Sequence, residues 1–324
     1  MNSSHTALRL REKSLWVLGY AAEDYPGDSR AADSIRSRGS RLDACADFAF
    51  FVRDDGYLAG SVNTQILGAA AARDVGYLVL FHNFDGQRFD PRPLQAILSS
   101  PPLQRTFIRN VLDSLPAGSA GIQLDFEEVQ AGDRLPYVHL LESLQAVLHE
   151  RGLLLTATLP AKRSEGEAPG YDFAGIGKLC DAVTLMTYDE HYAGGEPGPI
   201  AGLPWMIQAL DYAINLIPED KILVGIPVYG YDWSGAPTRM LPMRDIPALV
   251  AETKARVLWS DPAVEPYFYY WRGRDRHTVW FENELSAKIR LGFVKSYHLR
   301  GIAVWRLGYE TKRFWAAVST KLRH

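Results

Sequence analysis

Eight short apolar runs, alternating with longer helical patterns along the whole chain, constrain the fold more than any other feature of the sequence. The runs are rich in β-branched and aromatic residues, which is typical of buried strands. The expected strands span residues 15–20, 47–52, 76–81, 121–127, 153–159, 182–188, 222–230 and 301–307. Helical patterns such as LQRTFIRNVLDSL and YVHLLESLQAVLHE supply the crossovers that parallel strands require. Eight βα units predict an α/β protein with a closed (β/α)8 barrel, the TIM-barrel architecture, and 324 residues suffice for one.

One interval breaks this rhythm between the seventh strand and the helix that precedes the eighth. Residues 232–281 contain a helical piece, DIPALVAETKA, followed by two strand-like pieces, PYFYYWRG and RHTVWFE. The interval is full of aromatic residues and poor in Gly and Ser, so a flexible linker is a poor interpretation. We expect a barrel formed by residues 14–231 and 282–320, with residues 232–281 as a small α+β insertion between strand 7 and helix 7.

Composition narrows the possible partners. A content of 47% hydrophobic and 23% charged residues is typical of a globular protein, and a formal net charge of -3 gives no sign of nucleic-acid binding. The chain contains no run of about 18 apolar residues, so no membrane insertion is expected. The N-terminus has no apolar segment of signal-peptide length, which leaves the localisation open: the protein stays in the cell, or this chain is a mature or excised piece of an exported one. We expect a monomer.

The stretch SAGIQLDFEEVQ, residues 119–130, carries the most informative polar pattern. Side chains of a strand alternate between its faces, so Gln123, Asp125 and Glu127 are expected on one face. In a barrel this face points inward and leads to the carboxyl end of the strand, where active sites of such barrels lie. Burying carboxylates is costly without hydrogen bonds or a shared proton, so a purely structural role explains this pattern poorly.

These residues suit the hydrolysis of a glycosidic bond. The leaving oxygen needs a proton, and Glu127, at the strand end, is the candidate general acid. Asp125 on the same face is close enough that the two carboxyls are not expected to ionise together, which raises the pKa of the acid. The shared proton belongs to the pair.

Other candidates lie near the ends of further strands. On the sixth strand, Met186 and Tyr188 share a face, and Asp189 follows at the start of a polar loop. Trp305 is expected on the inward face of the last strand, either as a platform for the apolar face of a sugar or as core filling. For Tyr20 and Tyr229, at the ends of the first and seventh strands, core packing and substrate contact are equally open. No metal and no cofactor are expected, because no residues have metal-ligand spacing.

The motif AGIQLDFEE resembles the fourth-strand signature of glycoside hydrolase family 18, the chitinase-like enzymes, usually written D-G-x-D-x-D-x-E. Gly121, Asp125 and Glu127 match, whereas Ala120 and Gln123 stand where the signature has Asp. The branch of the family that is directed at spore cortex and peptidoglycan often carries an amide at the middle position. With Gln123 there, this chain resembles that branch. The segments LMTYDEHYAGGEPGPIAGLPWM, ILVGIPVYGYDW and GIAVWRLGYE also resemble that branch.

The resemblance implies a retaining, substrate-assisted mechanism, in which the 2-acetamido oxygen of the substrate is the nucleophile. It implies that Asp125 contacts the acetamido N–H and is oriented by Gln123, and that Tyr188 hydrogen-bonds the acetamido oxygen. Asp189, with Met186, is then expected to line the sugar subsite, and Trp305 to form its floor.

The expected function is therefore hydrolysis of a β-linked polymer that contains N-acetylglucosamine, best matched by peptidoglycan or an envelope or exopolysaccharide glycan. A chitinase is the alternative within this class. A catalytically inactive, lectin-like barrel that only binds glycans is the alternative from another class. The presence of both Asp125 and Glu127 argues against the lectin-like alternative, because the inactive members of the family have usually lost the acid.

Overall fold

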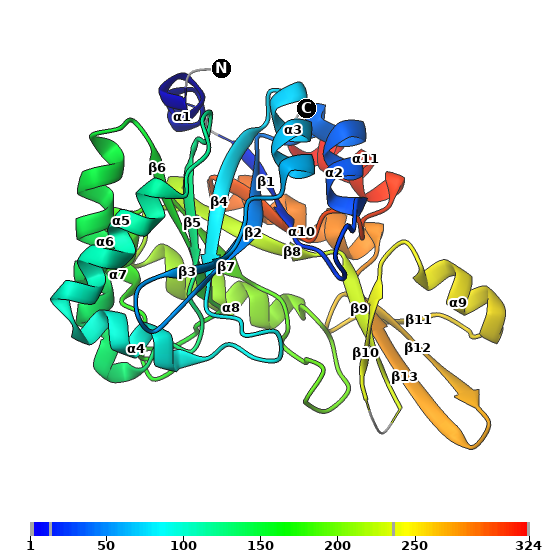
Figure 1. Cartoon of the computed structure of the whole chain (residues 1–324). Helices are drawn as coiled ribbons and strands as arrows, with labels where there is room; N and C mark the ends of the chain where they lie inside the picture. The colour runs from blue at the N-terminus through cyan, green and yellow to red at the C-terminus, as the bar shows by residue number, and fades with distance from the viewer. Residues whose placement is uncertain (1–2, 13–14, 235–236, 323–324) are drawn as a thin grey trace.

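The computed structural model of the chain describes residues 3–12, 15–234 and 237–322, and it confirms the predicted (β/α)8 barrel (Figure 1). Eight parallel strands follow one another around the barrel, and β1 pairs with both β14 and β2, which closes it. These strands are β1 (Trp16–Ala21), β2 (Ala44–Val52), β4 (Gly76–His82), β5 (Gly121–Asp125), β6 (Leu154–Pro160), β7 (Ala182–Met186), β8 (Ile222–Pro227) and β14 (Gly301–Trp305). A short strand, β3 (Leu58–Gly60), pairs with β2 in the antiparallel sense.

Helices surround the barrel, as crossovers between parallel strands require. They are α1 (Ser3–Glu12), α2 (Arg30–Arg38), α3 (Thr64–Ala72), α4 (Pro91–Ser99), α5 (Pro101–Asp113), α6 (Arg134–His149), α7 (Phe173–Leu179), α8 (Leu203–Ile214), α10 (Glu284–Ser296) and α11 (Lys312–Leu322). The local sequence determines where several helices begin. Asn283 and Ser286 form a reciprocal capping box at the start of α10, and Asp90 caps α4 just before Pro91. Among the described helices, none is both long enough and apolar enough to cross a bilayer.

The apolar core has two layers. The larger cluster fills the space between strands and helices, and a smaller one fills the barrel interior with side chains such as Leu18, Leu78 and Leu223. Gly121 allows β5 and β6 to approach closely, because a Cβ at this position would lie 2.2 Å from the Leu154 carbonyl oxygen. Cys45 and Cys180 are buried as free thiols in the larger cluster.

A second, five-stranded antiparallel sheet projects from the carboxyl-terminal end of the barrel, at the lower right of Figure 1. Its strands are β9 (Tyr229–Trp233), β10 (Arg239–Pro242), β11 (Leu258–Ser260), β12 (Glu265–Arg272) and β13 (Asp275–Phe281), and α9 (Ile246–Thr253) covers one face. All of them lie within residues 229–281. The division of the chain into a barrel and an α+β insertion stays a proposal. The sheet begins at Tyr229, three residues before the expected start of the insertion at 232.

Four strands end earlier than the apolar pattern predicts. β5 stops at Asp125, β7 at Met186 and β14 at Trp305, each two residues before its expected end. The expected strand 222–230 is divided into β8 and β9 at Val228, whose N–H donates to the Trp305 carbonyl. In each case the apolar pattern continues after the chain has left the barrel sheet.

Candidate functional site

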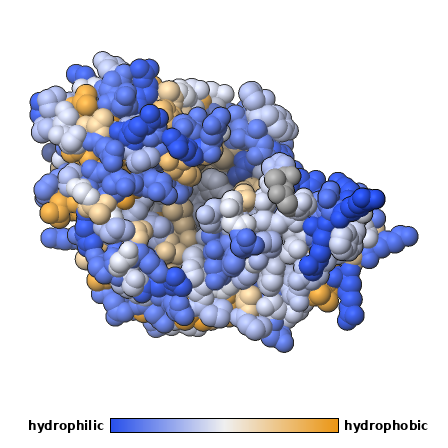
Figure 2. All heavy atoms as spheres, turned by 90° about the horizontal axis from the view of Figure 1, so that it is seen from below, coloured by the Kyte–Doolittle hydropathy of each residue, from blue (hydrophilic) through white to orange (hydrophobic). Residues whose placement is uncertain are grey.

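The strands converge on a hollow at the carboxyl-terminal end of the barrel, which Figure 2 shows from below, with apolar residues near its centre. Several of the candidate residues predicted from the sequence belong to the ends of these strands or to the residues that follow them. They are Gln123, Asp125, Glu127, Met186, Tyr188, Asp189 and Trp305.

A polar column lies inside the barrel on neighbouring strands. Gln123 of β5 donates from Nε2 to the Tyr20 hydroxyl at 3.1 Å and accepts from Thr156 of β6. One layer closer to the rim, the Thr158 hydroxyl donates to Asp125 Oδ1 at 2.5 Å. All five residues are buried. The hydrogen bond that the structure records for Asp125 thus comes from Thr158, while orientation of Asp125 by Gln123 stays a prediction.

Glu127 lies beyond the end of β5, where hydrogen bonds from side chains replace the backbone hydrogen bonds between neighbouring strands. Asn83, just after β4, accepts from the Glu127 N–H at 2.9 Å and donates to the Glu127 carbonyl at 2.8 Å. Asn83 is itself fully buried and donates to the Asp90 carbonyl at 2.9 Å. The backbone that carries Glu127 is therefore fixed on both its polar atoms by one side chain.

Tyr171 holds the residues on either side. Its hydroxyl donates to the Phe126 carbonyl at 2.8 Å and accepts from the Val129 N–H at 3.4 Å. Between them Glu128 adopts a φ of 58°, the left-handed region that bulky residues seldom occupy. The turn after β5 is thus built to present one side chain, Glu127, at the barrel rim.

The electrostatics of the carboxyl pair favour a retained proton. Burial raises the pKa of Asp125 to about 6, against the opposing effect of the Thr158 hydrogen bond. Burial also raises the pKa of Glu127 well above its usual value, and the negative charges of Asp125 and Asp189 add to this. The two carboxyls titrate as a pair, and Glu127 is its more basic site, because burial and the neighbouring negative charges all disfavour the ionised form of Glu127.

Tyr188 and Asp189 follow β7 as the chain turns out of the sheet. The Thr187 hydroxyl donates to the Gly225 carbonyl at 2.8 Å. Gly225 leaves the space that the Tyr188 ring fills, because a Cβ there would lie 2.7 Å from Cε1 of that ring. Burial, and then nearby Tyr and carboxyl groups, raises the pKa of Tyr188, so its hydroxyl stays protonated and can donate. Met186, at the end of β7, is partly exposed.

Asp189 is exposed, and Tyr229 of β9 holds its carboxylate. The Tyr229 hydroxyl donates to Asp189 Oδ1 at 2.5 Å. Crowding by protein atoms raises the pKa of Asp189 to about 6, although hydrogen bonds from Tyr229 and Tyr231 oppose this. Tyr229 is fully buried in β9, so it reaches the site through Asp189 and presents no surface to a ligand.

Trp305 is partly exposed at the end of β14 and rests on aromatic rings below it. Its ring centroid lies 5.4 Å from that of Tyr20 and 6.1 Å from that of Phe48. Tyr20 is only 1% exposed, so its ring supports Trp305 from the barrel interior. The sequence did not decide between core packing and substrate contact for Tyr20 and Tyr229. Both are buried, and they lie behind the side chains that form the surface of the site.

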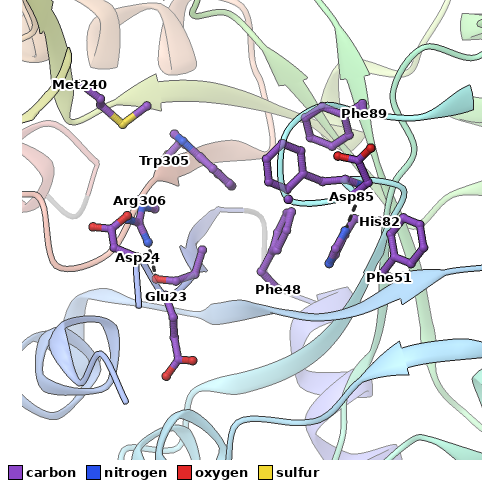
Figure 3. A pocket seen from close by; sticks show the side chains of 13 residues that line it. Glu23, Asp24, Phe48, Phe51, His82, Asp85, Phe89, Met240, Trp305 and Arg306 are labelled. Carbon is purple, nitrogen blue, oxygen red and sulfur yellow. Dashed lines mark hydrogen bonds and ion pairs between the residues drawn. The ribbon is translucent and has the colours of Figure 1, made fainter. Parts of the chain in front are cut away.

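A cavity of about 660 Å³ is lined by Trp305, Phe48, His82 and Arg306, among others (Figure 3). Phe48 and His82 line it as a stacked pair, with ring centroids 4.0 Å apart. Burial lowers the pKa of His82 to about 4, so this imidazole is neutral near pH 7. Arg306, opposite these rings in Figure 3, is paired with Asp24. Apolar rings beside Trp305 suit the apolar face of a further sugar unit.

Sequence reasoning missed the supporting residues Asn83, Thr158, Tyr171 and Gly225. Thr158 could have been predicted, because Thr156 and Thr158 alternate in LLLTATL with the same two-residue spacing as Gln123 and Asp125 in the preceding strand. Asn83 and Tyr171 sit in loops, and their distance from Glu127 along the chain hides the contact. The β4–β5 register, with His82 opposite Asp125, brings Asn83 beside Glu127.

The match to known families is specific. Residues 82–310 match the model of the family described as "Glycosyl hydrolases family 18". The chain belongs to glycosyl hydrolase family 18. It is therefore a glycosidase, and the resemblance seen in the strand motifs is confirmed.

Similar proteins carry different names. An "Uncharacterized glycosylase YvbX" of Bacillus subtilis is 27% identical over 303 residues, 90% of this chain and 88% of that protein. The "Cortical fragment-lytic enzyme" of Bacillus subtilis is 26% identical over 284 residues, which cover 84% of this chain but only 66% of that protein. The crystal structure of a chitinase from Chromobacterium violaceum superposes with a TM-score of 0.87 at 30% identity, covering 96% of this chain and 99% of the other.

Proposed function

We propose that the protein hydrolyses β-linked N-acetylglucosamine polymers by a retaining, substrate-assisted mechanism. Glu127 is the general acid, Asp125 orients the substrate acetamide and balances the cationic intermediate, and Tyr188 donates to the acetamide oxygen. The observation that carries this proposal is the placement of two carboxyls at the end of β5: Asn83 holds the backbone of Glu127 at the barrel rim, and Thr158 holds the buried Asp125 beneath it.

Each half of the pair is suited to a different task. Glu127 is partly exposed in the hollow, and its raised pKa keeps a proton available for the leaving oxygen. Asp125 is buried and its Oδ1 accepts from Thr158, which favours its ionised form relative to that of Glu127. Environments that separate two carboxyl groups in this way assign the acid and its charged neighbour.

The other nearby carboxylate, Asp189, is poorly suited to be a nucleophile. The Tyr229 hydroxyl donates to its Oδ1 at 2.5 Å, and this hydrogen bond lowers the nucleophilicity of the carboxylate. Attack by the acetamide oxygen of the substrate needs no protein nucleophile and is an established exception to the scheme with two carboxylates. Tyr188, as a protonated donor beside this carboxylate, is well suited to hold that acetamide.

Peptidoglycan, or a related envelope glycan, is the substrate that we favour, and chitin is the second candidate. Similarity to the cortical fragment-lytic enzyme supports the first, and similarity to the chitinase supports the second. Trp305 and the adjoining cavity of about 660 Å³ support binding of a polymer, since the cavity leaves room for further sugar units beside the one on Trp305. Mass spectrometry of digests of defined muropeptide glycan strands and of N-acetylglucosamine oligomers tests the choice. Absence of hydrolysis of both substrates would contradict the proposal.

We expect kcat/KM to fall on both sides of a pH optimum. As the pH rises above the raised pKa of Glu127, the acid loses its proton; as it falls below about 6, Asp125 gains one. The Thr158 hydrogen bond lowers the pKa of Asp125, so Thr158→Val is expected to move the acidic limb to higher pH. The pH profiles of wild type and variant check this, with Thr320→Val on α11 as control. An acidic limb that stays in place or moves to lower pH would refute the assignment.

Asn83→Ala is expected to lower kcat about 10- to 100-fold while changing KM much less, because small misplacements of a catalytic group are costly. Asn83→Asp keeps an acceptor for the Glu127 N–H but loses the donor to the carbonyl, so it should retain an intermediate kcat. Asn110→Ala is a matched control, since Asn110 also donates to a backbone carbonyl, that of Gly56, at 2.9 Å. Steady-state kinetics measure the difference. Equal kcat in the Asn83→Ala and Asn110→Ala variants would remove Asn83 from the positioning of Glu127.

A further inference from the structure

The β12–β13 hairpin, residues 265–281, which we call the aromatic arm, carries a row of aromatic side chains on one face. Tyr267, Tyr269 and Trp271 alternate along β12 and so share this face. On the opposite face, Phe268 and Tyr270 are buried in the cluster that includes α9. The row itself is open: Tyr269 is 39% exposed and Trp271 is 66% exposed.

The row is continuous with the catalytic hollow. Trp280 of β13 is opposite both Tyr267 and Tyr231 in the sheet, and directly opposed residues share a face. The rings of Tyr267 and Trp280 stack with centroids 4.5 Å apart, and those of Tyr267 and Tyr269 are 5.6 Å apart. At the inner end, the Tyr231 ring lies 5.5 Å from that of Tyr229, whose hydroxyl donates to Asp189 of the site. The strand register therefore places aromatic side chains on one face of the sheet from Tyr231 to Trp271.

The tip of the arm is also basic. The sequence WRGRDR, residues 271–276, holds three arginines and one aspartate. The Arg276 guanidinium lies 4.2 Å from the centroid of the Tyr269 ring, and Arg272 pairs with Glu252 of α9. The outer part of the row therefore combines flat apolar surfaces with fixed positive charge, on a protein whose formal net charge is -3.

We propose that the aromatic arm is a secondary binding site for a carboxylate-bearing peptidoglycan strand, which it anchors outside the catalytic hollow. The apolar faces of the sugars stack on Trp271 and Tyr269, and Arg276, which is opposite Trp271 in the sheet, pairs with a carboxylate of the strand. A neutral polymer would use the rings and leave Arg276 without a carboxylate partner. A second copy of the chain is a poor occupant, because a symmetric contact would bring two basic tips together. The inference rests on the proposed function, since it extends that site along the same polymer.

The test is co-sedimentation with purified insoluble peptidoglycan, with all proteins in a Glu127→Gln background so that no hydrolysis is needed. Trp271→Ala with Arg276→Gln is expected to weaken binding at least about 10-fold, since exposed aromatic and arginine anchors dominate such surfaces. The double variant is also made with Glu127 intact. Its kcat/KM on a soluble N-acetylglucosamine oligomer, which is too short to reach the arm, should stay within about twofold of the wild-type value. Tyr57→Ala removes an aromatic ring that is 53% exposed outside the arm, and it should bind as the wild type does.

Charge is tested with the single variant Arg276→Gln and with chitin powder. Arg276→Gln should weaken binding to peptidoglycan more than binding to chitin, and added salt should reduce this difference. Unchanged peptidoglycan binding in the double variant would overturn the proposal, as would equal losses on chitin and peptidoglycan. Concentration-dependent dimers in the wild type that disappear in the double variant would assign the arm to self-association instead. Because binding is measured without turnover, an error in the catalytic assignment would leave these results intact.

Discussion

Glu127→Gln should leave a folded protein that still binds substrate but turns it over at least about 10²-fold more slowly, because it removes the positioned proton donor. The fold should survive, since the turn after β5 is held through the backbone of Glu127 by Asn83 and not through its carboxyl. Binding should survive because glutamine has nearly the same size. Initial rates on the hydrolysed polymer, together with a binding measurement on the same preparation, give both quantities.

Glu128→Gln is the matched control. Glu128 lies in the same turn and undergoes the same substitution, but its side chain is exposed. It should retain most of the wild-type turnover, with only a small shift of the basic limb of the pH profile, because its charge contributes the smallest part of the raised pKa of Glu127. Turnover like that of the wild type in Glu127→Gln, or equal losses in both variants, would end the assignment of Glu127 as the acid.

The second large effect concerns the substrate. If the acetamide oxygen attacks, the sugar on the non-reducing side of the cut must be N-acetylated. A free amine at this position lacks the nucleophile and places positive charge near the developing oxocarbenium ion. We expect cleavage after glucosamine to be at least about 10²-fold slower than cleavage after N-acetylglucosamine, by analogy with the loss of a positioned catalytic group. Digestion of partially deacetylated oligomers and sequencing of the new reducing ends measure this ratio; frequent glucosamine at those ends would contradict it.

Asp125→Asn should reproduce part of that loss on the fully acetylated substrate. The variant keeps the size of the side chain and an acceptor for Thr158, but it removes the charge that orients the acetamide and balances the cation. It also removes the like charge that raises the pKa of Glu127, so the basic limb of the pH profile should move to lower pH. Asp211→Asn on α8, an exposed carboxylate that accepts from Tyr297, is the control. A basic limb that does not move would show that the two carboxyls titrate independently.

The sequence predicted the barrel well because each strand carries its own apolar signal. The strand ends were less predictable, since apolar residues continue where the chain leaves the sheet. Phe126 follows β5 and packs with Phe107 and Tyr137 outside the barrel. Because Phe126 is apolar, the alternation of apolar and polar residues continues in the sequence to Glu127, although the strand ends at Asp125. Pro227 ends β8, yet the next residues enter a different sheet with the same aromatic, β-branched character.

For the site, the sequence identified the residues near strand ends but not the ones that hold them. Asp125 and Asp189 could be found because carboxylates beside buried strands are unusual. Asn83 could not, because its contact with Glu127 spans 44 positions and depends on the register of β4 and β5. The roles of Tyr20 and Tyr229 also depend on packing depth, which an end-of-strand position does not specify.

The most direct measurement of the central claim is the configuration of the first product. Substrate-assisted attack followed by addition of water inverts the anomeric carbon twice, so a β-linked substrate yields a β product before mutarotation. Early-time proton NMR of the anomeric signals, recorded with the wild-type protein and an N-acetylglucosamine oligomer or muropeptide strand that it cleaves, resolves the two anomers. The account predicts that the β anomer of the new reducing end appears first, and an initial α anomer would contradict it.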